Sequence, residues 1–293
     1  MRVFVTGGTG WVGHEVVDDL LDSGHQVLGL ARSENSANAL TAKGVEVLRG
    51  TLDDLDRLTE AAGNSDAVIH LAFDHDFSRF VENAEQERRA IEAMGKALVG
   101  TDKRILITAG LALLTPGRVV TEADMPPPFD PNFPRLNEVA AAALAERGVR
   151  VGSVRLAPTV HGIGDQLFLA ILAGLARQTG VSAYIGDGTN RWPAVHVSDA
   201  GRLYRLALEA GAPARFYHAC AEDGVPFRAI AEAIGRALDL PAEARPPEHF
   251  GALAPFAAAD APASSARTRE TTGWRPTGPT LLADLAQPAY FAR

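Results

Sequence analysis

The sequence predicts an α/β fold: a doubly wound parallel sheet followed by a smaller C-terminal lobe. Short apolar segments alternate with helical patterns through the first half of the chain. Strands this apolar are typical of a parallel sheet whose two faces are both covered by helices. Beyond residue 156 the alternation loosens, and Pro and Ala accumulate over 241–265. We therefore expect a first domain over 1–155, to which 195–212 returns, and a lobe formed by 156–194 and 213–293.

Each element follows from its own pattern. Apolar runs predict strands of the sheet over 2–6, 26–31, 45–49, 66–72, 104–109 and 149–156. Helical spacing of apolar residues predicts helices from Val12 to Leu21 and over 53–62, 79–99 and 138–147. A Pro-rich segment, 126–134, interrupts this order. Beyond residue 156 we expect helices over 165–178, 198–209 and 226–239, and a strand over 194–197.

Composition excludes several classes of protein. The net charge of −8 and the pI of about 5.5 argue against nucleic acid as the main partner. Cys220 is the single cysteine, so an intramolecular disulfide and a cysteine-based metal site are excluded, and the scattered histidines lack metal-ligand spacing. No apolar run approaches the roughly 18 residues of a membrane span, and the first strand runs directly into glycines without a signal peptide. We expect a soluble, cytoplasmic protein that binds a small molecule, with no metal, nucleic acid or membrane.

The first strand is followed by a glycine-rich turn that opens a helix. Thr6 to Gly13 reads T-G-G-T-G-W-V-G. Gly7 permits a tight turn, Gly10 lets a pyrophosphate approach the backbone, and Gly13 lets the helix lie close to the strand. Free N–H groups and the helix dipole favour an anion there. This predicts a dinucleotide site; the alternative is a plain turn that happens to carry glycines.

The end of the second strand predicts which dinucleotide binds. A carboxylate for the ribose 2′-hydroxyl is expected there, but the sequence reads Leu30-Ala31-Arg32-Ser33. A guanidinium pairs with a 2′-phosphate, whereas an acid would repel it. We therefore expect NADP(H) to be preferred over NAD(H). The alternative is that Arg32 stacks on the adenine and accepts both cofactors.

With these motifs the sequence resembles atypical and extended short-chain dehydrogenases/reductases of the NAD(P)-dependent epimerase/dehydratase type. The resemblance also rests on the fourth strand, on 154–158, on His196-Val197-Ser198-Asp199 and on Gly273-Trp274-Arg275-Pro276. By analogy with extended members it implies a homodimer. The cofactor-binding residues expected from the motifs and the resemblance together are Thr6, Gly7, Thr9, Gly10, Trp11, Val12, Gly13, Arg32, Ser33, Leu52, Asp53, Leu71, Ala72, Phe73, Arg135, Ala157 and Pro158.

The superfamily's Tyr-x-x-x-Lys pair does not occur in this sequence. No lysine follows Lys103 and no tyrosine precedes Tyr184. The matching place, 130–135, ends in Arg135, which we expect to hold the nicotinamide ribose rather than to donate a proton, because its pKa lies above about 12. The alternative for Arg135 is an ordinary surface arginine at a helix start.

Three residues are the expected catalytic candidates. Thr108 stands where the superfamily's catalytic hydroxyl lies, His75 is flanked by two aspartates expected to raise its pKa, and His161 follows the sixth strand in a glycine-rich turn. Each residue also has a non-catalytic alternative. Thr108 would bond the backbone, His75 would lie in a solvated loop, and His161 would cap a loop. We expect Asn190, Arg191 and Trp192 to line the substrate cleft. Tyr204 and Cys220 are expected to be buried core residues.

The sequence thus predicts an NADP(H)-dependent oxidoreductase that transfers hydride to or from a small carbonyl or hydroxyl compound without the usual Tyr/Lys pair. Two alternatives stay open. One is a cofactor-binding sensor without turnover. The other is a sugar-nucleotide epimerase or dehydratase, for which only Arg191 and Arg202 offer basic groups for a diphosphate.

Overall fold

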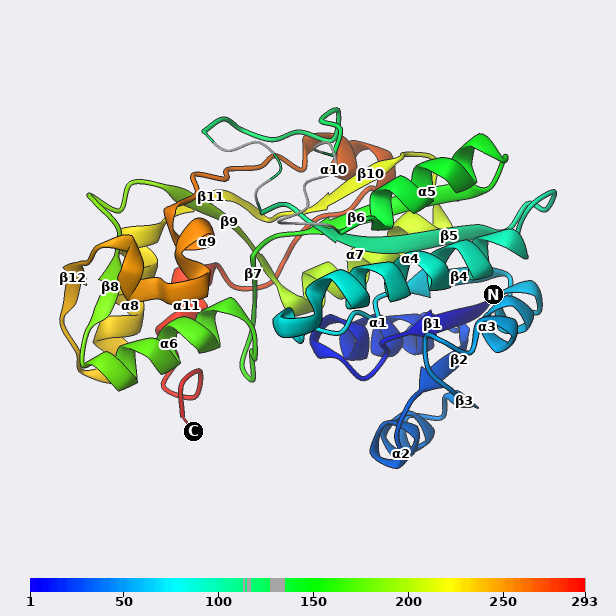
Figure 1. The fold of residues 1–293 in the computed structure, drawn as a ribbon, viewed down its shortest axis with the longest axis horizontal. Coiled ribbons are helices and arrows are strands. Elements are labelled where there is room, and N and C mark those ends of the chain that lie inside the picture. The colour runs from blue at the N-terminus through cyan, green and yellow to red at the C-terminus, as the bar shows by residue number, and fades with distance from the viewer. Residues whose placement is uncertain (113, 115–116, 127–134, 293) are drawn as a thin grey trace.

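The computed structural model describes residues 1–112, 114, 117–126 and 135–292. A seven-stranded sheet with strand order β10-β6-β5-β4-β1-β2-β3 forms its larger part (Figure 1). Every neighbouring pair in this sheet is parallel, so the strands end at one common edge. The strands are β1 (Arg2–Thr6), β2 (Gln26–Ala31), β3 (Glu46–Arg49), β4 (Ala67–His70), β5 (Arg104–Gly110), β6 (Arg150–Leu156) and β10 (Phe216–Ala219).

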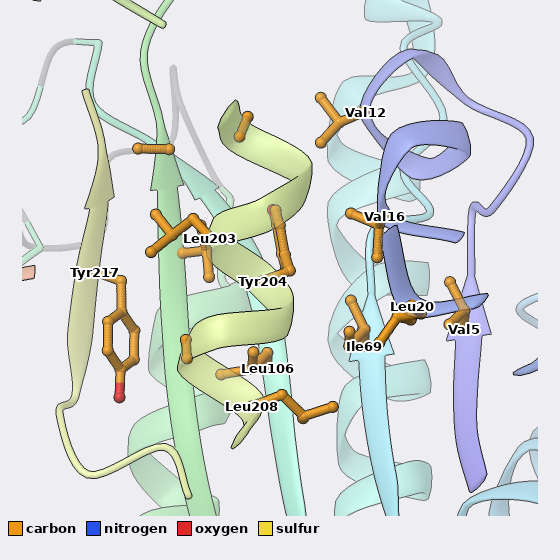
Figure 2. Packing of buried hydrophobic residues seen from close by; sticks show 14 of the residues in the cluster. Val5, Val12, Val16, Leu20, Ile69, Leu106, Leu203, Tyr204, Leu208 and Tyr217 are labelled. Carbon is orange, nitrogen blue, oxygen red and sulfur yellow. The ribbon is translucent and has the colours of Figure 1, made fainter. Parts of the chain in front are cut away.

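Helices cover both faces of this sheet, as the apolar strands predict. The helices α1 (Trp11–Asp22) and α7 (Val197–Glu209) pack on one face, where Val16, Leu20 and Leu203 belong to a single buried cluster (Figure 2). A second cluster lies on the other face, beneath α3 (Leu55–Gly63), α4 (Phe80–Lys96) and α5 (Asn137–Glu146). The α/β doubly wound prediction is confirmed.

Two parts of the sheet region differ from the prediction. Phe216–Ala219 was expected in the lobe, but it pairs with β6 as a seventh strand because all four of its residues are buried. The prediction that residues from 213 onward belong to the lobe is therefore wrong for Phe216–Ala219. The helix α2 (Glu34–Ala42) was not predicted, since only Ala37 and Leu40 of this polar segment are buried.

The smaller lobe is built on a three-stranded sheet of order β11-β9-β7, seen at the left of Figure 1. Its helices enclose a third buried cluster that includes Trp192, Phe227 and Ile230. The lobe's strands are β7 (Thr159–His161), β8 (Ser182–Tyr184), β9 (Arg191–His196), β11 (Glu222–Pro226) and β12 (Ala242–Ala244). The remaining helices are α6 (Phe168–Thr179), α8 (Phe227–Leu238), α9 (Ala254–Ala258), α10 (Ala266–Thr272) and α11 (Leu281–Leu285). Short 3₁₀ turns cover Phe77–Arg79 and Pro247–Leu253.

The segment at 196–199 and the segment at 273–276, two motifs of the resemblance, lie against each other in the fold. The fully buried Trp274 donates its indole N–H to the carbonyl of Asp199 at 2.9 Å. The Asp199 carboxylate accepts hydrogen bonds from the backbone N–H groups of Thr277 and Gly278. These contacts fix the C-terminal segment against the start of α7. Within the described ranges, no helix has the length and apolarity to cross a membrane.

Candidate functional site

A cleft of about 900 Å³ opens at the carboxyl-terminal edge of the large sheet. This is the edge at which ligands bind in open α/β sheets. The phosphate turn, the ends of β2, β4, β5 and β6, and residues of α5, α6 and α9 line it. All of the expected cofactor-binding residues lie on its wall except Thr6, which is buried behind it. The sequence therefore assembles one continuous site from segments that lie between Gly7 and Phe256, most of the chain apart.

The glycine turn has the geometry of a diphosphate cradle. A Cβ on Gly7, whose φ is +74°, would lie 2.7 Å from the amide nitrogen of Ala72. A Cβ on Gly13 would lie 2.0 Å from the Gly7 carbonyl oxygen, so no other residue fits without a shift. Gly10 caps α1 without any side-chain hydrogen bond, which leaves the first-turn N–H groups available to an anion. These residues fit the diphosphate of a dinucleotide.

Thr6 braces the turn from behind. Its hydroxyl is hydrogen-bonded to Nδ1 of His70 at 2.7 Å and accepts the amide N–H of Ala72 at 3.3 Å. Burial, reinforced by the charge of Arg135, lowers the pKa of His70 to about 3. The imidazole is therefore neutral at physiological pH. It ties the end of β1 to the end of β4 beneath the cleft.

The far end of the cleft carries the residues expected at the adenosine. The Arg32 side chain is 76% exposed, and its guanidinium lies 4.0 Å from the Asp74 carboxylate. Ser33 lines the cleft and also caps α2, since its hydroxyl accepts the N–H of Ser36. The Asp53 carboxylate accepts a hydrogen bond from Gln86 at 2.6 Å. Arg32 is thus an accessible cation, and among the described residues its ion-pair partner is Asp74 at this long distance.

Arg135 forms a buried ion pair beside the cleft. Its guanidinium donates two hydrogen bonds to the Glu87 carboxylate, at 2.7 and 3.0 Å, and one to the Thr108 carbonyl at 3.2 Å. The Glu87 side chain is only 1% exposed, and the Phe73 ring lies 4.4 Å from the guanidinium carbon. Although burial opposes it, Glu87 raises the pKa of Arg135. The alternative of a surface arginine is wrong, while residues 127–134 before it lie outside the described part of the chain.

Thr108 is held by a hydroxyl pair that the sequence did not predict. Its Oγ1 donates to the His70 carbonyl at 2.8 Å and lies 2.8 Å from the hydroxyl of Tyr204, which donates to it in turn. Burial raises the pKa of Tyr204 far above its usual value, so the phenol keeps its proton. Tyr204 is a core residue, as predicted. Its helical spacing gave no indication that the hydroxyl reaches Thr108 on β5.

The two histidine candidates are separated by the fold. His75 lines the cleft, with its ring 5.2 Å from that of Phe73. Desolvation and the nearby Arg135 lower its pKa, so the expected rise from its flanking aspartates is wrong. His161 is fully buried, bonds Asp284 through Nδ1 at 2.8 Å, and is not on the described wall of the cleft.

The segment 190–192 does not line the described cleft wall, so its predicted place is wrong. Asn190 donates to two backbone carbonyls of the segment after α8, and Arg191 pairs with Asp260 at 2.8 Å. Trp192 is buried and donates its N–H to the Phe256 carbonyl at 3.1 Å. These residues hold 256–260 in place. Cys220 is buried, as expected, and the described residues contain no cluster suited to a metal ion.

A doubly wound sheet with a glycine-lined, anion-binding turn defines the class of nucleotide-binding α/β proteins. Known proteins agree with this class. A family model described as NAD(P)H-binding matches residues 7–149. The uncharacterized protein C2A9.02 of Schizosaccharomyces pombe is 46% identical over 297 residues, covering 99% of this chain and 100% of that protein. The 2'-dehydrokanamycin reductase of Streptomyces kanamyceticus is 32% identical over 256 residues, covering 82% of this chain and 68% of that protein.

The solved structures share the fold. The structure of MoeE5 in complex with UDP-glucuronic acid and NAD superposes with a TM-score of 0.73 at 22% identity, covering 99% of this chain and 98% of that chain. The chain belongs to the NAD(P)-binding short-chain dehydrogenase/reductase family, and it is atypical in lacking the Tyr-x-x-x-Lys pair. Its relatives include reductases and dehydrogenases.

Proposed function

We propose that this protein is an NADP(H)-dependent oxidoreductase that transfers hydride to or from a small carbonyl or hydroxyl compound. The observation that carries the proposal is the single cleft, which joins the diphosphate cradle at Gly7–Gly13 to the Thr108 hydroxyl. A relative that covers most of this chain is named as a reductase. The structural and sequence evidence thus supports cofactor chemistry at a site with room for a second molecule.

The preference for NADP(H) is supported by the charge at the end of β2. Arg32 is exposed and accessible, and Ser33 and Ser36 line the cleft beside it. No carboxylate stands at the end of β2, where an NAD-type site would place one. The 2′-phosphate would find a guanidinium and two hydroxyl groups in this place.

The bound nicotinamide would supply the hydride, and the chain's own residues would orient the reactants. Thr108 would turn its single hydroxyl proton from the His70 carbonyl to the substrate oxygen, and the hydrogen bond that it accepts from Tyr204 would strengthen it as a donor. Arg135, fixed by Glu87, would hold the nicotinamide ribose hydroxyls through the N–H groups that Glu87 and the Thr108 carbonyl leave available. His75 lies on the cleft wall, where it could relay a proton together with water, whereas His161 is too deeply buried to reach the cleft.

Calorimetry with NADPH and NADH tests the cofactor part. We expect NADPH to bind more tightly than NADH. Arg32→Ala should lower the affinity for NADPH by ten- to a hundredfold, about 1.5–3 kcal/mol for a charge-assisted contact, and leave the affinity for NADH unchanged. Arg150→Ala is the matched control, because Arg150 is an exposed arginine paired with Asp102 at the opposite end of the strands. Equal affinity for both cofactors in every variant would contradict the NADP(H) preference.

Turnover tests the catalytic part. We expect NADPH to be consumed with carbonyl substrates, and Thr108→Val to slow the reaction more than it weakens NADPH binding. The missing Tyr-x-x-x-Lys pair favours one alternative, a cofactor-binding sensor. Tight NADPH binding without consumption across a broad carbonyl panel would support the sensor instead.

A further inference from the structure

The lobe side of the cleft presents an aromatic wall. Phe168 of α6 and Phe256 of α9 both line the cleft, with ring centroids 5.1 Å apart. Both side chains are only half-buried, so they present ring surface to the cleft. Trp192 packs behind Phe168 at 5.7 Å and bonds the Phe256 carbonyl. The wall is therefore part of the lobe's core packing rather than a loose loop.

A second group of apolar side chains faces the cleft from the sheet side. Phe73 and Phe80 lie on its wall with their rings 5.8 Å apart. Val139 of α5 also lines the cleft and is 53% exposed. Aromatic and aliphatic surface thus meets a ligand from both sides, and such surface favours an apolar body over a hydrated one.

Among the described residues, the same region offers no unpaired arginine or lysine for a phosphate group. Arg135 is neutralised by its bidentate bond to Glu87, and the buried Arg155 is paired with Glu138. Arg191 and Arg202, the basic groups the sequence offered for a diphosphate, pair with Asp260 and Asp199 and do not line the described cleft wall.

Of the undescribed residues, Arg293 at the C-terminus is the one basic residue, and the stretches that adjoin the cleft lining carry none. By sequence, residues 113, 115–116 and 127–134 contain no lysine, arginine or histidine. Among the described lining residues, Arg32 is the remaining arginine, and it stands at the adenosine end. A diphosphate placed against the aromatic wall would lose its hydration without gaining an ion pair, which is costly.

We propose that the substrate is an uncharged carbonyl compound with an aromatic or branched aliphatic body, bound between Phe168 and Phe256 on one side and Phe73 and Val139 on the other. A nucleotide sugar, which the solved neighbour MoeE5 holds together with NAD, does not fit this wall. The inference rests on the proposed function, because it concerns the second molecule of that same cleft.

The test is binding, so it does not depend on turnover. The protein is saturated with NADP⁺, and acetophenone and UDP-glucose are titrated separately by calorimetry and by saturation-transfer NMR. We expect acetophenone to bind and UDP-glucose to give no response at equal concentration. Phe256→Asp and Val139→Asp should each lower the affinity for acetophenone by about tenfold or more, because each places a carboxylate against the apolar ligand.

Ile171→Asp is the matched control, because Ile171 is 47% exposed on the same helix as Phe168 but does not line the cleft. Val139→Asp keeps the test valid if Phe256→Asp fails to fold, since the Val139 side chain is already largely in water. Binding of UDP-glucose in place of acetophenone, or loss of acetophenone affinity in the Ile171 control alone, would overturn the inference. Acetophenone binding that needs Phe256 but leads to no NADPH consumption would support the inference and count against the catalytic proposal only. Failure of NADP⁺ itself to bind would overturn both.

Discussion

The Glu87–Arg135 pair gives the most direct test of how the cleft is built. Glu87→Ala removes the partner of a buried guanidinium, which is linked to the carboxylate by hydrogen bonds of 2.7 and 3.0 Å. Breaking a buried pair this way costs roughly 3–5 kcal/mol, and we expect about 3 because Arg135 keeps the Thr108 carbonyl and the Phe73 ring. At roughly 2–4 °C per kcal/mol this lowers Tm by about 6–12 °C. Calorimetric unfolding measures the loss.

The matched control lies two residues away on the same helix. Glu85 pairs with Arg88, but its side chain is 45% exposed, so Glu85→Ala should change stability by less than about 1 kcal/mol. The double variant Glu87→Met/Arg135→Met should recover most of the stability, because an apolar pair replaces both charges. Equal, small losses for Glu87→Ala and Glu85→Ala would refute the argument that the buried pair holds this part of the site.

Three further outcomes follow. Gly13→Ala should weaken NADPH binding at least tenfold, about 1.4 kcal/mol, because the added Cβ would meet the Gly7 backbone. Gly174→Ala, in open space on α6, should leave NADPH binding intact in the same calorimetric titration. Tyr204→Phe should lower stability by about 1 kcal/mol and slow turnover without altering NADPH affinity, since only the bond to Thr108 is lost; unfolding and steady-state kinetics separate the two effects. His70 is neutral in the fold, while the unfolded chain takes up a proton below pH 6.5. Stability should therefore fall by up to about 1.4 kcal/mol per pH unit from 6.5 toward 3, and His70→Gln should lack this part of the acid loss in pH-dependent denaturation.

The sheet could be predicted because parallel strands buried on both faces must be apolar throughout. The turn at Gly7–Gly13 could be predicted as well, since the steric demand on each glycine is local. The polar α2 was missed because its stability comes from the Ser33 cap and two buried residues, too few for a helical period. Elements with a continuous apolar pattern or a strict steric demand are thus visible in the sequence, and a helix with two buried residues is not.

Glu87 shows why the rest of the site could not be predicted. It stands in a helix with many charged residues, and nothing in that pattern separates it from Glu85 or Glu92. Only the packing of α4 against α5 buries Glu87 and brings it to Arg135, 48 residues further along. The predicted role of Trp192 failed for the same reason, because tertiary packing turned that side chain into the lobe core.

The groups around Thr108 share a property that follows from their burial. Glu87 keeps Arg135 charged, burial keeps Tyr204 protonated, and burial keeps His70 neutral. None of these three changes its charge near neutral pH, whereas a Tyr/Lys pair works because its pKa is tuned into that range. The cleft therefore offers the substrate oxygen fixed hydrogen-bond dipoles in place of a titrating acid. Stabilisation by preorganised groups of this kind requires no proton transfer from the side chains that provide it. The proton in such a site must arrive through a group at the solvent edge of the cleft, and His75 is the described histidine on that wall.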